Sequence, residues 1–180
     1  MVGREALLAQ HPDAVLEAAS HDAVRFFSSH PGGIGGLDAL KTACLAGVEG
    51  FSIQVAKPPA AWRGFRFVET LGVDLDRLDH ACTLFEGPAR EGVPHFPQNV
   101  NIAAVLALAG IGMDRTRLKV VADRALTLNT HMILVTGRSG RFTVVLENVP
   151  SPDNPKTSWL ACYSALAAVR SLGSRVRYGS

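Results

Sequence analysis

The chain has 180 residues, of which 47% are hydrophobic, and its formal net charge is +2. This length and composition suffice for one solid core or for two small domains. The small charge and the scattered basic residues argue against nucleic acid as a partner. No apolar run approaches the about 18 residues that a membrane-spanning helix requires, so we expect no membrane association.

The cysteines predict the compartment. Cys44, Cys82 and Cys162 are isolated in the sequence, with no CxxC motif and no Cys/His pair. An odd number of isolated cysteines argues for a reducing compartment and against a zinc site. Because no signal peptide is visible either, we expect a cytoplasmic protein without a bound metal.

Taken in order, the first half of the chain predicts helices, a glycine-rich loop and two strands. The predicted elements are helices at 5–10, 21–27 and 37–46, a breaker-rich loop at 28–36, and strands at 51–56 and 81–85. The strand at 51–56 alternates with period two, which is typical of a half-buried strand, and Pro58-Pro59 ends it. Residues 62–79 carry no clear pattern.

The second half is organised around the stretch from Phe96 to His131. Pro97 suits the first turn of a helix, and short amides precede the apolar run 102–109. Further predicted elements are strands at 118–123, 127–135 and 141–147, and a long helix at 156–172. Gly137–Gly140 lies between the last two strands and predicts a hairpin. The helix that contains the apolar run 102–109 would direct its amide-rich start toward a cleft. The strand at 127–135 would direct His131 toward the same cleft.

This order of elements predicts an α+β domain. We expect a mostly antiparallel sheet that is covered by helices, chiefly on one face. Such an architecture says nothing about function by itself, which has to be argued from individual residues.

The glycine cluster Gly32–Gly36 invites comparison with a dinucleotide-binding loop. It does not match G-x-G-x-x-G, because position 38 is Asp and no strand precedes the cluster. A more modest role is open to it, since glycines allow a close approach of ligand to backbone and the following helix start favours an anion.

His131 is the best single candidate for general acid–base chemistry. Histidine titrates near neutral pH and can pass protons at an amine or a carbonyl carbon. A strand histidine satisfied by its neighbours is the alternative, and the pattern alone favours that alternative.

Two polar segments are equally open to two interpretations. Asn99 and Asn101 suit either helix capping or ligand binding. The proline-rich segment 147–158 is either a rigid loop with a helix cap or a wall of the site, where Lys156 and helix N–H groups would offer positive potential to a carboxylate.

Several motifs, taken together, resemble the catalytic domain of the L-aspartate dehydrogenase family over residues 32 to about 170. The matching motifs are Gly-Gly-Ile-Gly-Gly-Leu-Asp-Ala-Leu (32–40), Phe-Glu-Gly-Pro-Ala-Arg (85–90), Phe-Pro-Gln-Asn-Val-Asn-Ile-Ala-Ala (96–104), Asn-Thr-His (129–131) and Glu-Asn-Val-Pro-Ser-Pro-Asp-Asn-Pro-Lys-Thr-Ser (147–158). They are long, ordered and specific.

The resemblance implies an NAD- or NADP-dependent oxidoreductase that converts L-aspartate to iminoaspartate, which yields oxaloacetate and ammonia or enters pyridine-nucleotide biosynthesis. By similarity, His131 would be the catalytic acid/base and Asn101 a cofactor contact. Gly33 falls where the family usually has an Ala that contacts the cofactor. Lys156 and Asn129 are candidate substrate contacts, and family analogy suggests a homodimer.

The resemblance also suggests two unequal parts. Residues 1–30 would be a remnant of a Rossmann-type nucleotide-binding domain, since Pro12–Arg25 resembles a piece from the middle of it, and 31–180 would be the catalytic domain. Two hypotheses follow: an aspartate dehydrogenase or its catalytic part, or a non-catalytic, dimerising remnant that lacks the cofactor platform. NAD and NADP are not distinguished, because the residue that reads the ribose belongs to the nucleotide-binding domain.

Overall fold

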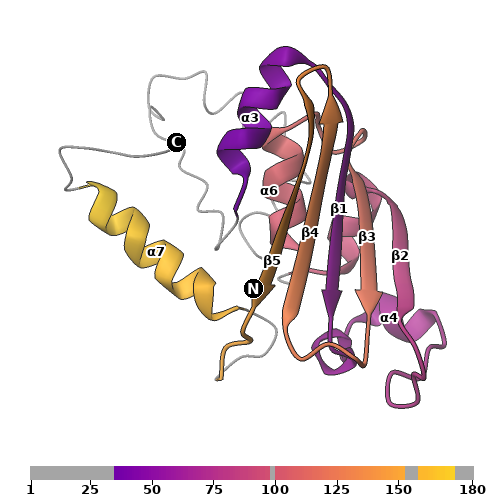
Figure 1. Cartoon of the computed structure of the whole chain (residues 1–180). Helices are drawn as coiled ribbons and strands as arrows, with labels where there is room; N and C mark the ends of the chain where they lie inside the picture. Colours follow the sequence, from indigo (N-terminus) through magenta and orange to yellow (C-terminus); the bar gives the residue numbers. More distant parts are fainter. Residues whose placement is uncertain (1–34, 98–99, 153–157, 173–180) are drawn as a thin grey trace, which may run out of the picture.

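The computed structural model describes residues 35–97, 100–152 and 158–172. Within these ranges the chain forms one mixed sheet with short and medium helices around it (Figure 1). The elements are α3 (Leu37–Ala46), β1 (Val48–Lys57), η1 (Pro59–Trp62), α4 (Arg66–Thr70), β2 (Cys82–Pro88), α5 (Ala89–Gly92), η2 (Val93–His95), α6 (Asn101–Ala109), β3 (Arg117–Ala122), β4 (Asn129–Gly137), β5 (Gly140–Asn148) and α7 (Trp159–Leu172).

The sheet has five strands in the order β2-β3-β1-β4-β5. β1 pairs with β3 in parallel, whereas the β1–β4, β2–β3 and β4–β5 pairs are antiparallel. β4 and β5 form the hairpin that the glycines predicted, with Gly137 opposite Gly140. The prediction of an α+β fold with a mostly antiparallel sheet is confirmed.

The two faces of the sheet differ in burial. Helices α3 and α6 cover one face (Figure 1), which we call the covered face, and the core lies between them and the sheet. Alternate residues of the strands supply this core: Ile53 and Val55 of β1, Leu118 and Val120 of β3, and Ile133 and Val135 of β4 are each at most 1% exposed. The opposite, open face carries Met132 and Leu134, which are partly exposed.

Helix α6 is buried nearly all round, which explains its uniformly apolar sequence. Ile102 to Ala107 are all buried, so the helix lies inside the core and not on the surface. It begins at Asn101, after Val100, and not at Pro97 as the proline suggested. Pro97 lies in a turn, after the separate 3-10 helix η2. A different proline, Pro94, occupies the first turn of η2.

Further boundaries differ from the predictions. β1 begins at Val48 and not at residue 51, and β4 spans Asn129–Gly137 and not 127–135. β2 continues through Glu86-Gly87-Pro88, which were expected to close it, because these residues still pair with β3. Pro88 is accommodated at the last position of an edge strand. The segment without a clear pattern, 62–79, contains one short helix, α4, and starts at the last residue of η1. The helices predicted at 5–10 and 21–27 lie outside the described residues.

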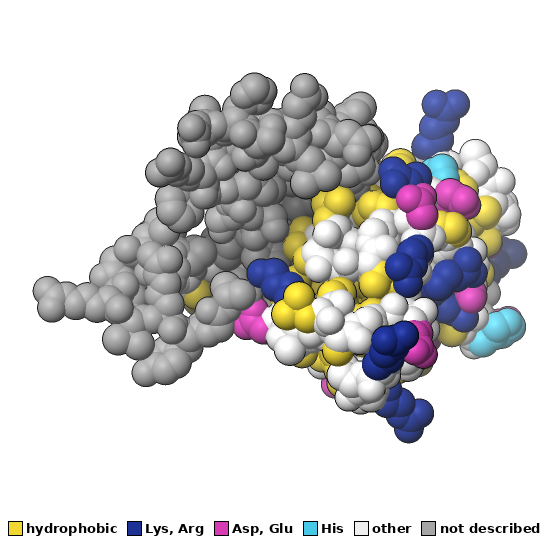
Figure 2. Space-filling view, turned by 90° about the horizontal axis from the view of Figure 1, so that it is seen from above, with side chains coloured by type: hydrophobic (Ala, Val, Ile, Leu, Met, Phe, Trp, Pro, Cys, Tyr) yellow, Lys and Arg dark blue, Asp and Glu magenta, His cyan; other side chains and the backbone are white. Residues whose placement is uncertain are grey.

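The surface offers no extended patch of one charge on the side seen in Figure 2, where basic and acidic side chains are interspersed. Four ion pairs among the described residues connect exposed groups, as between Arg90 and Asp114. None of the helices within the described ranges is long and apolar enough to cross a membrane.

Candidate active site

His131 lies near the start of β4, on the covered face. It pairs with Val55 of β1 and with Leu146 of β5, so its neighbours on both sides are apolar. The side chain is 8% exposed, and its Nδ1 has no hydrogen-bond partner within the described part of the chain. The alternative prediction, a histidine satisfied by its neighbours, therefore does not describe this nitrogen.

Unpartnered polar atoms gather in one motif. Among the described residues, four buried side-chain atoms lack a hydrogen-bond partner: both amide atoms of Asn129, Oγ1 of Thr130 and Nδ1 of His131. These residues are consecutive, and Asn129 is only 1% exposed. Because buried polar groups in native proteins are nearly always paired, such a concentration is expected where a ligand supplies the missing partners.

A buried lysine lies beside this motif. Lys57 is the last residue of β1 and is 3% exposed. Ala56 pairs with Thr130, and continuing this register by one residue places Lys57 beside Asn129. Lys57 lies two residues after Val55 and so points to the same face of the sheet, and His131 is the pairing partner of Val55. Lys57 and His131 therefore share the covered face.

Burial and charge set the protonation of both groups. Burial lowers the pKa of Lys57 from 10.5 to about 7. Burial, and secondarily the positive charge of Lys57, lower the pKa of His131 from 6.5 to about 3. At neutral pH the imidazole of His131 is therefore uncharged. Lys57, in contrast, gains and loses its proton near neutral pH.

The aromatic ring of Trp62 lies close to the ammonium group of Lys57. The Lys57 Nζ lies 5.7 Å from the centre of the Trp62 ring, which is a cation–π distance. Trp62 itself is fully buried and donates a hydrogen bond of 3.0 Å from Nε1 to the carbonyl of Val121. The ring is thus fixed to β3, and Lys57 is enclosed between β3 and β4.

Helix α6 approaches β1 at its C-terminal end. Gly110, just after α6, is packed so tightly that an added Cβ would lie 3.2 Å from Cε1 of Phe51. Figure 1 shows α6 on the covered face of the sheet. Asn101, the first residue of α6, lies at the opposite end of this helix and is partly buried.

The structure brings together two of the sequence-predicted site residues, Asn129 and His131, which lie on the covered face near the start of β4. Asn101 is the first residue of α6 and is partly buried. Gly33 and Lys156 lie outside the described residues, as does Asn99. Pro150 and Ser158 form an isolated bridge, and Ser151 is buried.

Lys57 was missed by the sequence analysis. The signal for it was present, because the period-two pattern that buries Phe51, Ile53 and Val55 places position 57 on the same face. A lysine is unusual at a position where the strand alternation predicts a buried side chain, since lysine is almost never fully buried without a partner or a function.

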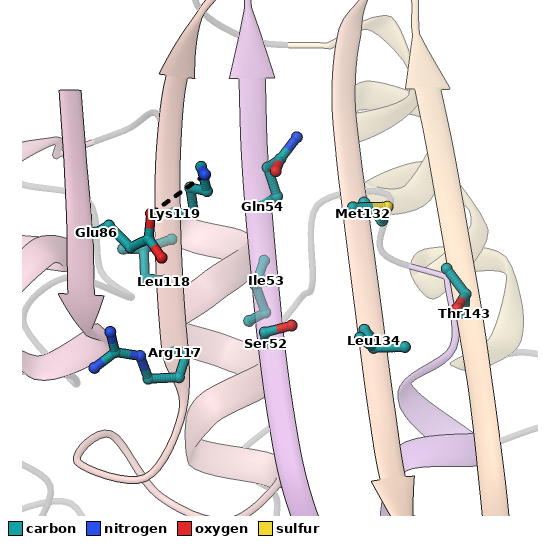
Figure 3. A pocket seen from close by; sticks show the side chains of 10 residues that line it. All are labelled: Ser52, Ile53, Gln54, Glu86, Arg117, Leu118, Lys119, Met132, Leu134 and Thr143. Atoms are coloured by element: carbon teal, nitrogen blue, oxygen red, sulfur yellow. Dashed lines mark ion pairs between the residues drawn. The ribbon is translucent and has the colours of Figure 1, made fainter. Parts of the chain in front are cut away.

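A hollow of about 260 Å³ lies on the other side of the sheet (Figure 3). It is lined by Gln54, Met132 and Leu134, and by the ion pair between Lys119 and Glu86, whose N–O distance is 3.2 Å. By strand alternation these side chains point away from His131. The hollow therefore belongs to the open face and not to the site.

Chemically, the site combines a neutral base, a donor–acceptor amide and a cationic group in a water-poor environment. A neutral imidazole accepts a proton from an ammonium or a hydroxyl. The amide of Asn129 binds a group that both donates and accepts, and Lys57 favours an anion. A ligand with an amine and a carboxylate fits this set.

Comparisons with known proteins point in one direction. Residues 38–172 match the family described as "Aspartate dehydrogenase, C-terminal". The chain is 44% identical over 163 residues to an L-aspartate dehydrogenase of Methanosarcina acetivorans, covering 91% of the chain and 59% of that relative. It is 48% identical over 141 residues to L-aspartate dehydrogenase 2 of Bordetella pertussis, covering 77% of the chain and 51% of that relative.

A solved structure is similar as well. The crystal structure of an aspartate dehydrogenase from Thermotoga maritima aligns with a TM-score of 0.69 at 28% sequence identity. The alignment covers 97% of this chain and 66% of that one. The chain thus spans between half and two thirds of the length of these proteins.

Proposed function

The chain belongs to the aspartate dehydrogenase family, and we propose on that premise that it carries the catalytic part of an enzyme that oxidises L-aspartate to iminoaspartate. The product then hydrolyses to oxaloacetate and ammonia, or enters pyridine-nucleotide biosynthesis. The observation that carries the proposal is His131, buried on the covered face, whose Nδ1, like the nearby amide of Asn129, has no hydrogen-bond partner in the part of the chain that the structure describes.

The proposed role of His131 is to hold and move one proton. Oxidation of an amino acid at Cα requires the amine to be deprotonated while a hydride leaves the carbon. Burial, and secondarily the charge of Lys57, lower the pKa of His131 to about 3 in the ligand-free protein, so its imidazole is neutral there with a lone pair free for a proton, but it is a weak base until a ligand binds. The carboxylates of the bound substrate would raise the basicity of His131, since they oppose the charge of Lys57.

A nicotinamide cofactor, NAD or NADP, would supply the hydride acceptor. The described residues fit such a group, since the buried amide of Asn129 has no hydrogen-bond partner among them and Asn101 offers a second, partly buried amide at the start of α6. An amide pairs well with the carboxamide of a nicotinamide ring. NAD and NADP differ at the ribose 2′ position, far from this end, so an assay has to include both.

We further propose that the protein is a homodimer. Support comes from the open face, where Met132, Leu134 and Val145 are apolar and between 38% and 54% exposed. A second copy laid on this face would cover them. Leu134→Glu is expected to convert the dimer to a monomer in sedimentation velocity, whereas Leu45→Glu on α3, which is 92% exposed, should not. A monomeric wild-type chain would contradict the proposal.

The cytoplasmic location stays a prediction from the isolated cysteines. Cys44 and Cys82 are free thiols in the structure, which is compatible with a reducing compartment.

The decisive experiment is oxidation of L-aspartate by the purified chain, with NAD and with NADP, read as absorbance of the reduced cofactor. D-aspartate serves as the stereochemical control. Turnover of the L-isomer supports the dehydrogenase. A folded protein that binds neither cofactor and shows no turnover would instead favour the second hypothesis, a non-catalytic dimerising remnant.

A further inference from the structure

A second buried amide, that of Asn148, lies directly opposite Asn129 in the sheet. Asn148 is the last residue of β5 and is 8% exposed. It pairs with Asn129, so both side chains point to the covered face, as does His131 two positions further along β4. Burying an amide costs free energy unless it is hydrogen-bonded. Two amides and an imidazole therefore share one end of the covered face.

The two amides do not satisfy each other. Both amide atoms of Asn129 lack a hydrogen-bond partner in the described part of the chain, although directly paired residues have their Cβ atoms only about 4.5–5.5 Å apart. Asn129 is 1% exposed, so bulk water does not supply the missing partner. An amide with a free donor and a free acceptor is completed by a ligand group that both accepts and donates hydrogen bonds.

We propose that Asn129 and Asn148 together bind the amine and the α-carboxylate of the substrate, so that this pair of amides presents the amine to His131. Oδ1 of Asn129 accepts a hydrogen bond from the amine, and the NH2 groups of both amides donate to the α-carboxylate. This inference rests on the proposed function and specifies how the substrate is held within it. It assigns Asn129 to the substrate and leaves Asn101 as the amide for the cofactor.

The spacing of the three residues fits the head group of an amino acid. Asn129 and His131 are two positions apart on one strand, about 7 Å along it. Leu146, the partner of His131, lies two positions before Asn148, so Asn148 and His131 are diagonal neighbours, about 7–8 Å apart. Because the amine and the α-carboxylate are attached to the same carbon atom, one small head group is within reach of all three side chains.

This arrangement serves the proton transfer proposed for His131. A hydrogen bond to Oδ1 of Asn129 fixes one N–H of the amine and leaves another for the imidazole. An amide carries no charge and is not a base at neutral pH, so it positions the amine without competing for its proton. The strand neighbours of His131, Val55 and Leu146, are apolar and offer no competing side-chain hydrogen bond.

Two ligands that cannot be oxidised separate the contacts. The L-isomer of 2-methyl-aspartate keeps the amine and both carboxylates, but a methyl group replaces the hydrogen at Cα, so no hydride can leave. Succinate keeps the carboxylates and lacks the amine. Calorimetric titration of the purified chain with each compound, without cofactor, therefore measures binding independently of turnover.

Substitution of each amide has a different expected effect. Asn148→Leu should weaken both compounds at least tenfold, because it removes a donor to the carboxylate. Asn129→Leu also removes the amine contact, so it should weaken 2-methyl-aspartate about tenfold more than succinate. Asn148→Ala, whose smaller side chain avoids a clash, should reproduce the loss if the leucine variant does not fold. Asn148→Gln, which keeps the NH2 group, should restore part of the affinity.

The matched control is Thr143→Val, which replaces an exposed residue of β5 on the open face. It should leave both affinities unchanged. In the activity assay Asn148→Leu should raise the KM for L-aspartate at least tenfold, with a smaller effect on kcat.

The outcomes separate this inference from the proposed function. Binding of 2-methyl-aspartate that depends on both amides, in a protein without turnover, would support the amide pair and refute the dehydrogenase. Turnover of L-aspartate with unchanged KM and unchanged affinities in Asn148→Leu would support the dehydrogenase and overturn the amide pair. A folded wild-type protein that binds neither compound would overturn it as well.

Discussion

Lys57 at the end of β1 and His131 near the start of β4 lie on the same buried face, two positions apart across one antiparallel pairing. Burial, and secondarily the charge of Lys57, lower the pKa of His131. Near neutral pH His131 therefore stays neutral, and of the two side chains only Lys57 carries a proton that makes it cationic. The sheet thus places a neutral imidazole and a lysine side by side on its covered face.

Replacement of His131 is expected to remove most of the activity. His131→Ala should lower kcat for L-aspartate at least about a hundredfold, the usual contribution of a general base. Steady-state kinetics by reduced-cofactor absorbance measures this. His80→Ala, an exposed histidine far from the motif in sequence, is the control and should retain full turnover. Unchanged turnover of His131→Ala would end the role assigned to it.

The protonation state of His131 can be observed directly. Because its pKa is lowered to about 3, the imidazole should remain neutral from pH 8 down to pH 5 in the ligand-free protein. Long-range ¹H–¹⁵N NMR spectra of the histidine rings report the charge of each ring, and His131→Asn identifies its signals. A ring assigned to His131 that titrates near pH 6.5 would contradict the buried, neutral state.

Lys57 should make the folded protein less stable below its folded-state pKa than above it. Its pKa is lowered from 10.5 to about 7, so between these values the unfolded chain binds more protons than the folded one. The free energy of unfolding therefore rises with pH across this window, by about 3 kcal/mol from pH 6.5 to 9.5 if the shift is fully expressed.

Urea unfolding at the two pH values tests this effect of Lys57. Lys57→Met should be more stable than the wild type at pH 6.5 and should lose most of the rise. The surface variant Lys41→Met should keep the rise in full. The same pH dependence in the wild type and in Lys57→Met would show that Lys57 is not the source.

Asn129 is expected to lower the free energy of unfolding while contributing to ligand binding. Both of its buried amide atoms lack a hydrogen-bond partner among the described residues, which costs about 1–3 kcal/mol in the ligand-free protein. Asn129→Leu should therefore raise the free energy of unfolding by about 1 kcal/mol while weakening L-aspartate binding. As a comparison in the same strand, Ile133→Val should lower stability by about 1 kcal/mol. A large loss of stability in Asn129→Leu would mean that the amide is satisfied after all.

The glycine before α3 is required by packing as well as by its backbone angle. Gly36 has φ of 83°, and an added Cβ would lie 2.8 Å from Cγ2 of Val144. Gly64 has φ of 76° but nothing within 4 Å of such a Cβ. Gly36→Ala should therefore cost more than Gly64→Ala, by about 1 kcal/mol or more in urea unfolding. Equal losses would show that only the backbone conformation matters.

Much of the fold could be predicted because its signals are local. The helix at Leu37–Ala46 has the predicted ends, and β5 agrees to within one residue at each end. Helix caps, glycines and period-two alternation depend on neighbouring residues, which the sequence displays directly. The strand pattern also sufficed for the α+β class and for the hairpin.

The sequence alone determined the class of fold, the ends of α3 and, to within one residue, those of β3 and β5, and it pointed to the motif Asn129–His131 as a candidate site. It did not reveal that α6 starts at Asn101, nor that Lys57 is buried beside that motif. Those facts depend on which strand lies beside which and on which face the helices cover, and these pairings join residues that are far apart in the chain. Burial, and with it the lowered pKa values of Lys57 and His131, arises only when the sheet and helices close over the two side chains, so only the tertiary structure decided it.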